Sequence, residues 1–132
     1  MHPIDHLNRY VSNVDSFIAF YTEALGYRLL RKGTKANGQP YAILLGGGHE
    51  LFISQQEGFK AESGGNFRHI GYAVADADSL LADLKARGLA PMGTQIIVKQ
   101  FSRQFYLKDP DGFEIDLIQW TDKEGFTGSQ PT

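Results

Sequence analysis

The chain contains two segments that repeat the same residue types in the same order. When His6 is placed on His69, the same spacing puts Val11 on Val74, and the matched residues continue in the order of a strand, a helix cap and a helix. An ordered repeat of this length is the signature of a fold built from similar supersecondary units. The sequence therefore predicts two copies of one module.

Each copy has the pattern of a β-α-β-β-β module. Asn13 and Asp76 are typical helix N-caps. Gly26 and Gly88 stand where a left-handed residue ends a helix. Hydrophobic alternation between turn residues predicts strands at 4–11, 27–33, 40–45 and 49–55 in the first copy, and at 67–75, 94–99, 103–108 and 112–120 in the second.

The two modules are expected to form one unit of structure. Neither sheet could be covered on both faces by its own module, so the modules should pack together or against a second chain. We expect a single domain, 1–132, with a first module (4–55), a linker (56–66), a second module (67–120) and a C-terminal tail (121–132).

Composition narrows the classes of protein. The 132 residues are 42% hydrophobic, enough for a sizeable core, and carry a net charge of −2, which disfavours a nucleic-acid partner. The absence of cysteine excludes disulfides, thiolate metal sites and a cysteine nucleophile. Apolar stretches are shorter than a membrane span, and the N-terminus has no secretory pattern. We expect a cytoplasmic protein with no membrane partner.

Strand alternation gathers four metal-ligand side chains on the faces that the helices leave free. In each half, one histidine comes from the first strand and one carboxylate from the last. Two imidazoles and two carboxylates suit a divalent ion such as Zn, Ni, Co, Mn or Fe(II). Each residue alone is as well explained by an exposed or hydrogen-bonded role. These candidate metal ligands are His6, Glu50, His69 and Asp116.

These residues lie in motifs that resemble the vicinal oxygen chelate superfamily, which includes glyoxalase I, fosfomycin-resistance thiol transferases, bleomycin-binding proteins and extradiol dioxygenases. The resemblance covers residues 4–120 and rests on Phe20-Tyr21 with Leu25-Gly26, on His49 to Ile53, on Arg68 to Gly71 and on Phe105 to Asp116 with its Asp-Pro-Asp-Gly turn. It implies an α+β fold in which two tandem βαβββ modules form curled mixed sheets around a metal-binding cup. It also implies a homodimer that binds a small-molecule substrate.

Residue by residue, the resemblance makes His6 and His69 the histidine ligands and Glu50 the glutamate of the first module. Asp116 stands where the family usually has the longer glutamate. Glyoxalase I places an arginine on the cup side of the first strand to hold the glutathione carboxylate, and the residue at that point here is Tyr10. By strand parity, Arg9 points to the opposite face.

The implied function is glyoxalase I-like lyase or isomerase chemistry through an enediolate, on a substrate with vicinal oxygens that is not the glutathione adduct. Asp116 is the candidate base, with Glu50 second. An extradiol-type dioxygenase and a non-catalytic drug-sequestering protein of the bleomycin-resistance kind remain alternatives. Lys99 and Arg103 are candidates to hold a substrate anion. The expected substrate pocket consists of Asn8, Tyr10, Phe52, Ser54, Phe101 and Arg103.

Overall fold

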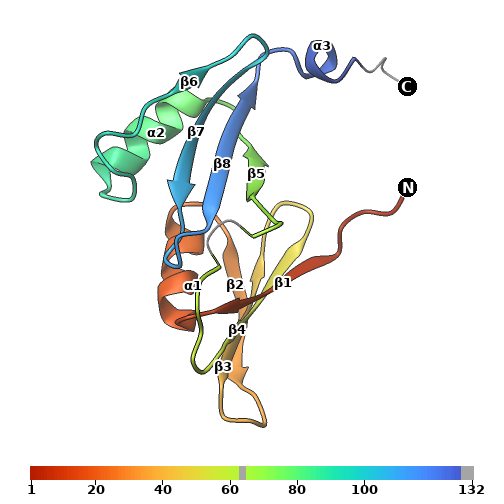
Figure 1. Cartoon of the computed structure of the whole chain (residues 1–132), viewed down its shortest axis with the longest axis vertical. Helices are drawn as coiled ribbons and strands as arrows, with labels where there is room; N and C mark the ends of the chain where they lie inside the picture. Colours follow the sequence, from red (N-terminus) through yellow and green to blue (C-terminus); the bar gives the residue numbers. More distant parts are fainter. Residues whose placement is uncertain (63–64, 129–132) are drawn as a thin grey trace. The chain divides into compact units, whose positions relative to one another are not determined.

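The structure, a computed structural model, describes residues 1–62 and 65–128. The chain forms two compact units, which Figure 1 shows. Unit 1 comprises Met1–Ser63 with Pro110–Gly112, and unit 2 comprises Gly64–Asp109 with Phe113–Thr132. Each unit contains one four-stranded mixed sheet, so the α+β class and the repeated βαβββ module predicted from the sequence are confirmed.

Unit 1 is built on a sheet with the strand order β1-β4-β3-β2. Its elements are β1 (His6–Val11), α1 (Val14–Glu23), β2 (Arg28–Thr34), β3 (Pro40–Leu45) and β4 (Glu50–Gln55). β1 and β4 run parallel, whereas β3 is antiparallel to both of its neighbours. The first and last strands of the module therefore lie side by side, with α1 packed against the sheet (Figure 1).

Unit 2 repeats this order as β5-β8-β7-β6. Its elements are β5 (His69–Ala73), α2 (Ala77–Ala86), β6 (Ile97–Val98), β7 (Ser102–Lys108), β8 (Glu114–Trp120) and α3 (Lys123–Thr127). β5 runs parallel to β8, and α2 packs against β7 and β8 (Figure 1).

The N-termini of α1 and α2 are held by the same two kinds of hydrogen bond. The side chains of Asn13 and Asp76 accept hydrogen bonds from the third residue after each of them, at 2.9 and 3.1 Å, as predicted for N-caps. In addition, Gln55 of β4 accepts from the first N–H of α1 at 3.1 Å, and Gln119 of β8 accepts from the first N–H of α2 at 2.9 Å. A glutamine in the last strand of each module therefore ties its helix to its sheet.

The buried positions of the helices follow the predicted period. Val14, Phe17 and Tyr21 are buried in α1, and Leu81 and Leu84 are buried in α2. These side chains pack on the aliphatic face of each sheet, where burial of apolar surface stabilises the module. The opposite faces, which carry the polar side chains of β1, β4, β5 and β8, are left for function.

The structure differs from the sequence prediction in three respects: where β1 and β5 begin, the length of β6, and the presence of a helix after β8. β1 and β5 begin at His6 and His69, later than predicted, because their pairing partners β4 and β8 begin at Glu50 and Glu114. β6 has only two residues, since residues 91–94 form a turn closed by a 3.0 Å hydrogen bond before it. Residues predicted to be a C-terminal tail include α3, which begins at the cap Asp122.

Within residues 1–62 and 65–128, no helix combines the length and the apolar run that crossing a membrane requires.

Candidate metal centre

The pair in unit 1 consists of His6 and Glu50, which are direct neighbours across the parallel strands β1 and β4. The His6 Nδ1 lies 2.8 Å from Asp5 Oδ2, and the imidazole stacks on the Phe52 ring with centroids 4.2 Å apart. Because a carboxylate only accepts hydrogen bonds, Nδ1 is the donor in this contact, and in the neutral form of the ring Nε2 carries the lone pair. A carboxylate that fixes the tautomer in this way is typical of metal-binding histidines.

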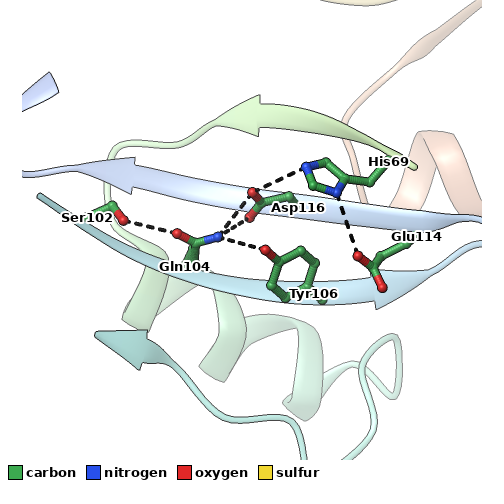
Figure 2. Close-up of polar contacts among 6 residues, drawn as sticks. All are labelled: His69, Ser102, Gln104, Tyr106, Glu114 and Asp116. Atoms are coloured by element: carbon green, nitrogen blue, oxygen red, sulfur yellow. Dashed lines mark hydrogen bonds and ion pairs between the residues drawn. The ribbon is translucent and has the colours of Figure 1, made fainter. Parts of the chain in front are cut away.

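The group in unit 2 consists of His69, Glu114 and Asp116, drawn in Figure 2. Strand register pairs His69 with Glu114 and Gly71 with Asp116. His69 Nδ1 is 3.6 Å from Glu114 Oε1, and His69 Nε2 is 3.9 Å from Asp116 Oδ2. Both distances are too long for hydrogen bonds. In the described part of the chain, His69 Nδ1 is the buried side-chain polar atom left without a hydrogen bond.

Asp116 is the buried carboxylate of this group, with a side chain 9% exposed against 40% for Glu114. Gln104 Nε2 donates to both of its oxygens, at 3.2 Å to Oδ1 and 3.1 Å to Oδ2 (Figure 2). Burial raises the pKa of Asp116, against the opposing effects of His69, Lys99 and the Gln104 hydrogen bond. The site therefore increases the proton affinity of this carboxylate while fixing its orientation.

The Gln104 amide is itself held by two neighbours on β7. Its Oε1 accepts from Ser102 Oγ at 3.0 Å, and its Nε2 donates to Tyr106 Oη at 3.0 Å (Figure 2). Burial and the charge of Asp116 raise the pKa of Tyr106, so its hydroxyl keeps its proton. A continuous polar chain runs along this face of the sheet from Ser102 to Asp116.

These donor sets fit a divalent ion. The His69 Nε2–Asp116 Oδ2 separation of 3.9 Å exceeds a hydrogen bond but is less than the sum of two coordination bonds of about 2.1 Å each. Imidazole nitrogen with carboxylate oxygen is the donor set of Zn and related metals. Within residues 1–62 and 65–128, however, no group of three or more His, Cys, Asp or Glu side chains meets the geometry of a metal site. The four predicted ligands thus form two pairs, one in each unit.

The remaining predicted pocket residues fall into different surroundings. Asn8 and Tyr10 are exposed on β1, and Ser54 is buried on β4 opposite Tyr10. Phe101 contacts Phe126 of α3, with ring centroids 6.2 Å apart. The structure therefore keeps Asn8, Tyr10, Phe52 and Ser54 in the sheet that carries the His6–Glu50 pair.

The two arginines discussed from the sequence both turn toward helices. Arg103 donates to the two carboxylate oxygens of Asp78 on α2, at 2.8 and 2.9 Å, and is not brought to the His69–Asp116 group. Arg9 donates to Tyr21 Oη at 2.7 Å and lies 5.5 Å from the centre of the Phe17 ring. The parity argument, which directs Arg9 away from the face of His6, is confirmed.

Sequence reasoning did not select four residues that the structure joins to the candidate ligands. Glu114 shares the face of Asp116 by alternation, and Asp5 directly precedes His6, so both could have been found from position. Gln104 and Tyr106 alternate on β7, but only the β7–β8 register, which pairs Tyr106 with Asp116, brings them to the carboxylate. A cavity of about 310 Å³ lies next to Glu50 in unit 1, and a cavity of about 300 Å³ lies next to Glu114 in unit 2.

The chain consists of two βαβββ modules, and each module carries a histidine and a carboxylate on neighbouring parallel strands. This defines the class of protein by its fold and site. A family model described as the Glyoxalase/Bleomycin resistance protein/Dioxygenase superfamily matches residues 3–117. The chain belongs to this superfamily.

Individual relatives agree with this assignment. The chain is 30% identical over 128 residues to a probable lactoylglutathione lyase of Synechocystis sp., covering 86% of this chain and 92% of the relative. It is 31% identical over 125 residues to a probable lactoylglutathione lyase of Vibrio cholerae, covering 89% and 91%. Among solved structures, a glyoxalase family protein of Enterococcus faecalis is similar with a TM-score of 0.71 and 26% identity, covering 86% of this chain and 94% of that one.

Proposed function

We propose that this protein is a metal-dependent enzyme with glyoxalase I-like lyase or isomerase chemistry on a small substrate with vicinal oxygens. The observation that carries the proposal is the His69–Asp116 pair, in which a histidine without a hydrogen bond at Nδ1 faces a buried carboxylate. Superfamily membership and identity of about 30% to probable lactoylglutathione lyases support the same reaction class.

The proposed ligands of one divalent ion are His6, Glu50, His69 and Asp116. We propose a homodimer with its sites at the subunit interface. A divalent ion in this site would act as a Lewis acid on the two substrate oxygens. Asp5 and Phe52 would keep the His6 ring oriented toward it, through the 2.8 Å hydrogen bond and the ring stacking.

Asp116 is the proposed base, and Glu50 is the second candidate. Proton transfer within the substrate requires a base that takes a proton from the carbon beside the carbonyl and returns it to the neighbouring carbon, and a carboxylate can serve as this base. Burial raises the pKa of Asp116, which brings its proton affinity closer to that needed for transfer near neutral pH. Lys99, whose charge acts on Asp116, would help to hold a substrate anion at the same face.

Metal analysis of the purified chain tests this proposal directly. We expect about one divalent ion per proposed site in the wild type and a loss of most of it in His69→Ala. His2→Ala is the matched control, because His2 is an exposed terminal histidine outside the ligand set. A wild type that binds none of Zn, Ni, Co, Mn or Fe(II) would contradict the proposal and favour the drug-sequestering alternative.

A further inference from the structure

The side-chain amide of Gln104 is hydrogen-bonded through both its oxygen and its nitrogen, and its neighbours allow only one orientation of the two atoms. Asp116 accepts hydrogen bonds as a carboxylate, so the Gln104 Nε2 must face it, and Oε1 must then face the donating hydroxyl of Ser102. The second N–H of Nε2 goes to Tyr106 Oη at 3.0 Å. With Gln104 only 3% exposed, this arrangement cannot be exchanged for contacts with water. The orientation of the amide is therefore fixed by its neighbours.

The same contacts fix the carboxylate of Asp116. Donation to Oδ1 at 3.2 Å and to Oδ2 at 3.1 Å places one N–H between the two oxygens and sets the plane of the carboxylate (Figure 2). In this plane, Oδ2 is the oxygen nearer to His69 Nε2, at 3.9 Å. Without the donor, the short side chain of Asp116 could rotate about its terminal bond at little cost.

We propose that Gln104 is a positioning residue that holds the carboxylate of Asp116 toward the ion shared with His69. This inference rests on the proposed function and adds to it a residue that acts only through Asp116. A neutral donor suits this role, because it orients the carboxylate without neutralising the charge that attracts the cation. Lysine or arginine at this point would compete with the metal for the same oxygens.

A double-mutant cycle on the full chain, titrated with Co²⁺, tests the inference. Gln104→Met keeps the length of the side chain and removes the donor. We expect it to weaken Co²⁺ binding about 10-fold and to change the visible absorption bands of the bound Co²⁺, which report ligand geometry. In an Asp116→Asn background, the same change should alter the affinity by less than about 2-fold, since a residue that acts through the carboxylate of Asp116 then has no carboxylate to orient.

The matched control is Gln119→Met, a glutamine in the neighbouring strand β8 whose side chain caps α2 with a 2.9 Å hydrogen bond. It should lower the melting temperature while leaving Co²⁺ affinity and spectrum unchanged. Should Gln104→Met fail to fold, Gln104→Asn replaces it in the same cycle, because it keeps a polar amide that is one methylene too short to reach Asp116.

The outcomes separate this inference from the proposed function. A wild type that binds no Co²⁺ overturns both. If the wild type binds Co²⁺ and the Gln104 variant binds it within about 2-fold with the same spectrum, only the positioning role is overturned. An equal loss with and without the Asp116→Asn substitution also overturns it, because Gln104 would then act independently of the carboxylate. A 10-fold loss confined to the background that keeps Asp116 supports it.

Discussion

Replacing Tyr10 with arginine should increase the activity toward the hemithioacetal of glutathione and methylglyoxal. In the resemblance to glyoxalase I, the residue at this point of the first strand is the arginine that holds the glutathione carboxylate. Tyr10 can donate one hydrogen bond but cannot neutralise that charge. Arg9 does not substitute for it, because its guanidinium is bound to Tyr21 at 2.7 Å on the helix side of the sheet.

The size of the gain follows from the exposure of the position. A hydrogen bond to a charged partner contributes about 1.5–3 kcal/mol, and solvent weakens it at exposed sites. Tyr10 is 60% exposed, so an arginine fits without repacking and should act at the lower end of this range. A contribution of about 1.5 kcal/mol corresponds to slightly more than a 10-fold increase in kcat/KM. Because the contact lies away from the reacting carbon, the gain should appear mainly in KM.

The assay is the spectrophotometric rate of hemithioacetal conversion with Zn, Ni, Co and Mn supplied in turn. Wild-type kcat/KM should stay below about 10⁴ M⁻¹s⁻¹, under the ordinary enzyme range. Tyr10→Leu is the control, since it removes the phenol without adding a cation. The reasoning is refuted if the wild type already exceeds this value with any metal, or if Tyr10→Arg gives no more activity than Tyr10→Leu.

Three further predictions concern the metal ligands and the assembly. Burial raises the pKa of Asp116, so in the metal-free protein its charge destabilises the fold progressively as pH rises from about 4 to this raised pKa, and by a constant amount above it. The stability of Asp116→Asn relative to the wild type, from urea unfolding with a chelator, should therefore increase from pH 3.5 to pH 7; a constant difference would contradict this. Glu50→Gln should weaken metal binding about 10-fold with an unchanged circular dichroism spectrum, and unchanged affinity would remove Glu50 from the ligand set. Light scattering at micromolar concentration should give a homodimer, and a monomer would rule out the shared site that we propose.

The fold could be predicted from the sequence because its signals are local and occur twice. The helix starts are marked by the capping residues Asn13 and Asp76, whose effect depends only on the residues that follow them. The helix ends are marked by Gly26 and Gly88, which adopt φ angles of 73° and 72° that other residues disfavour. The two-residue length of β6 and the presence of α3 could not be predicted in this way. α3 depends on Phe126 packing on Trp120 at 5.0 Å and on Phe101, a contact that no periodicity in five residues reveals.

The candidate site was predictable only where alternation determines which side chains share a face. Alternation places His6 on one face of β1 and directs Arg9 to the opposite face, where the structure shows it bound to Tyr21. Arg103 is predicted to line the pocket because of its charge, but alternation along β7 places it on the face that packs against α2. In the structure, it binds Asp78 of α2 on that face. The contact between Gln104 and Asp116 depends on the register of two strands, and a single sequence does not specify register between β7 and β8.

The repeat gives both modules a histidine and a carboxylate, but the surroundings make the two pairs chemically different. His6 is already oriented by Asp5, at 2.8 Å, and by the Phe52 ring, so its module supplies a fixed imidazole. Asp116 is instead a buried carboxylate, and burial raises its pKa while Gln104 orients both of its oxygens. A carboxylate with raised proton affinity and a fixed direction suits proton transfer better than a half-buried one such as Glu50. The difference between the modules, rather than their similarity, therefore favours Asp116 over Glu50 as the base.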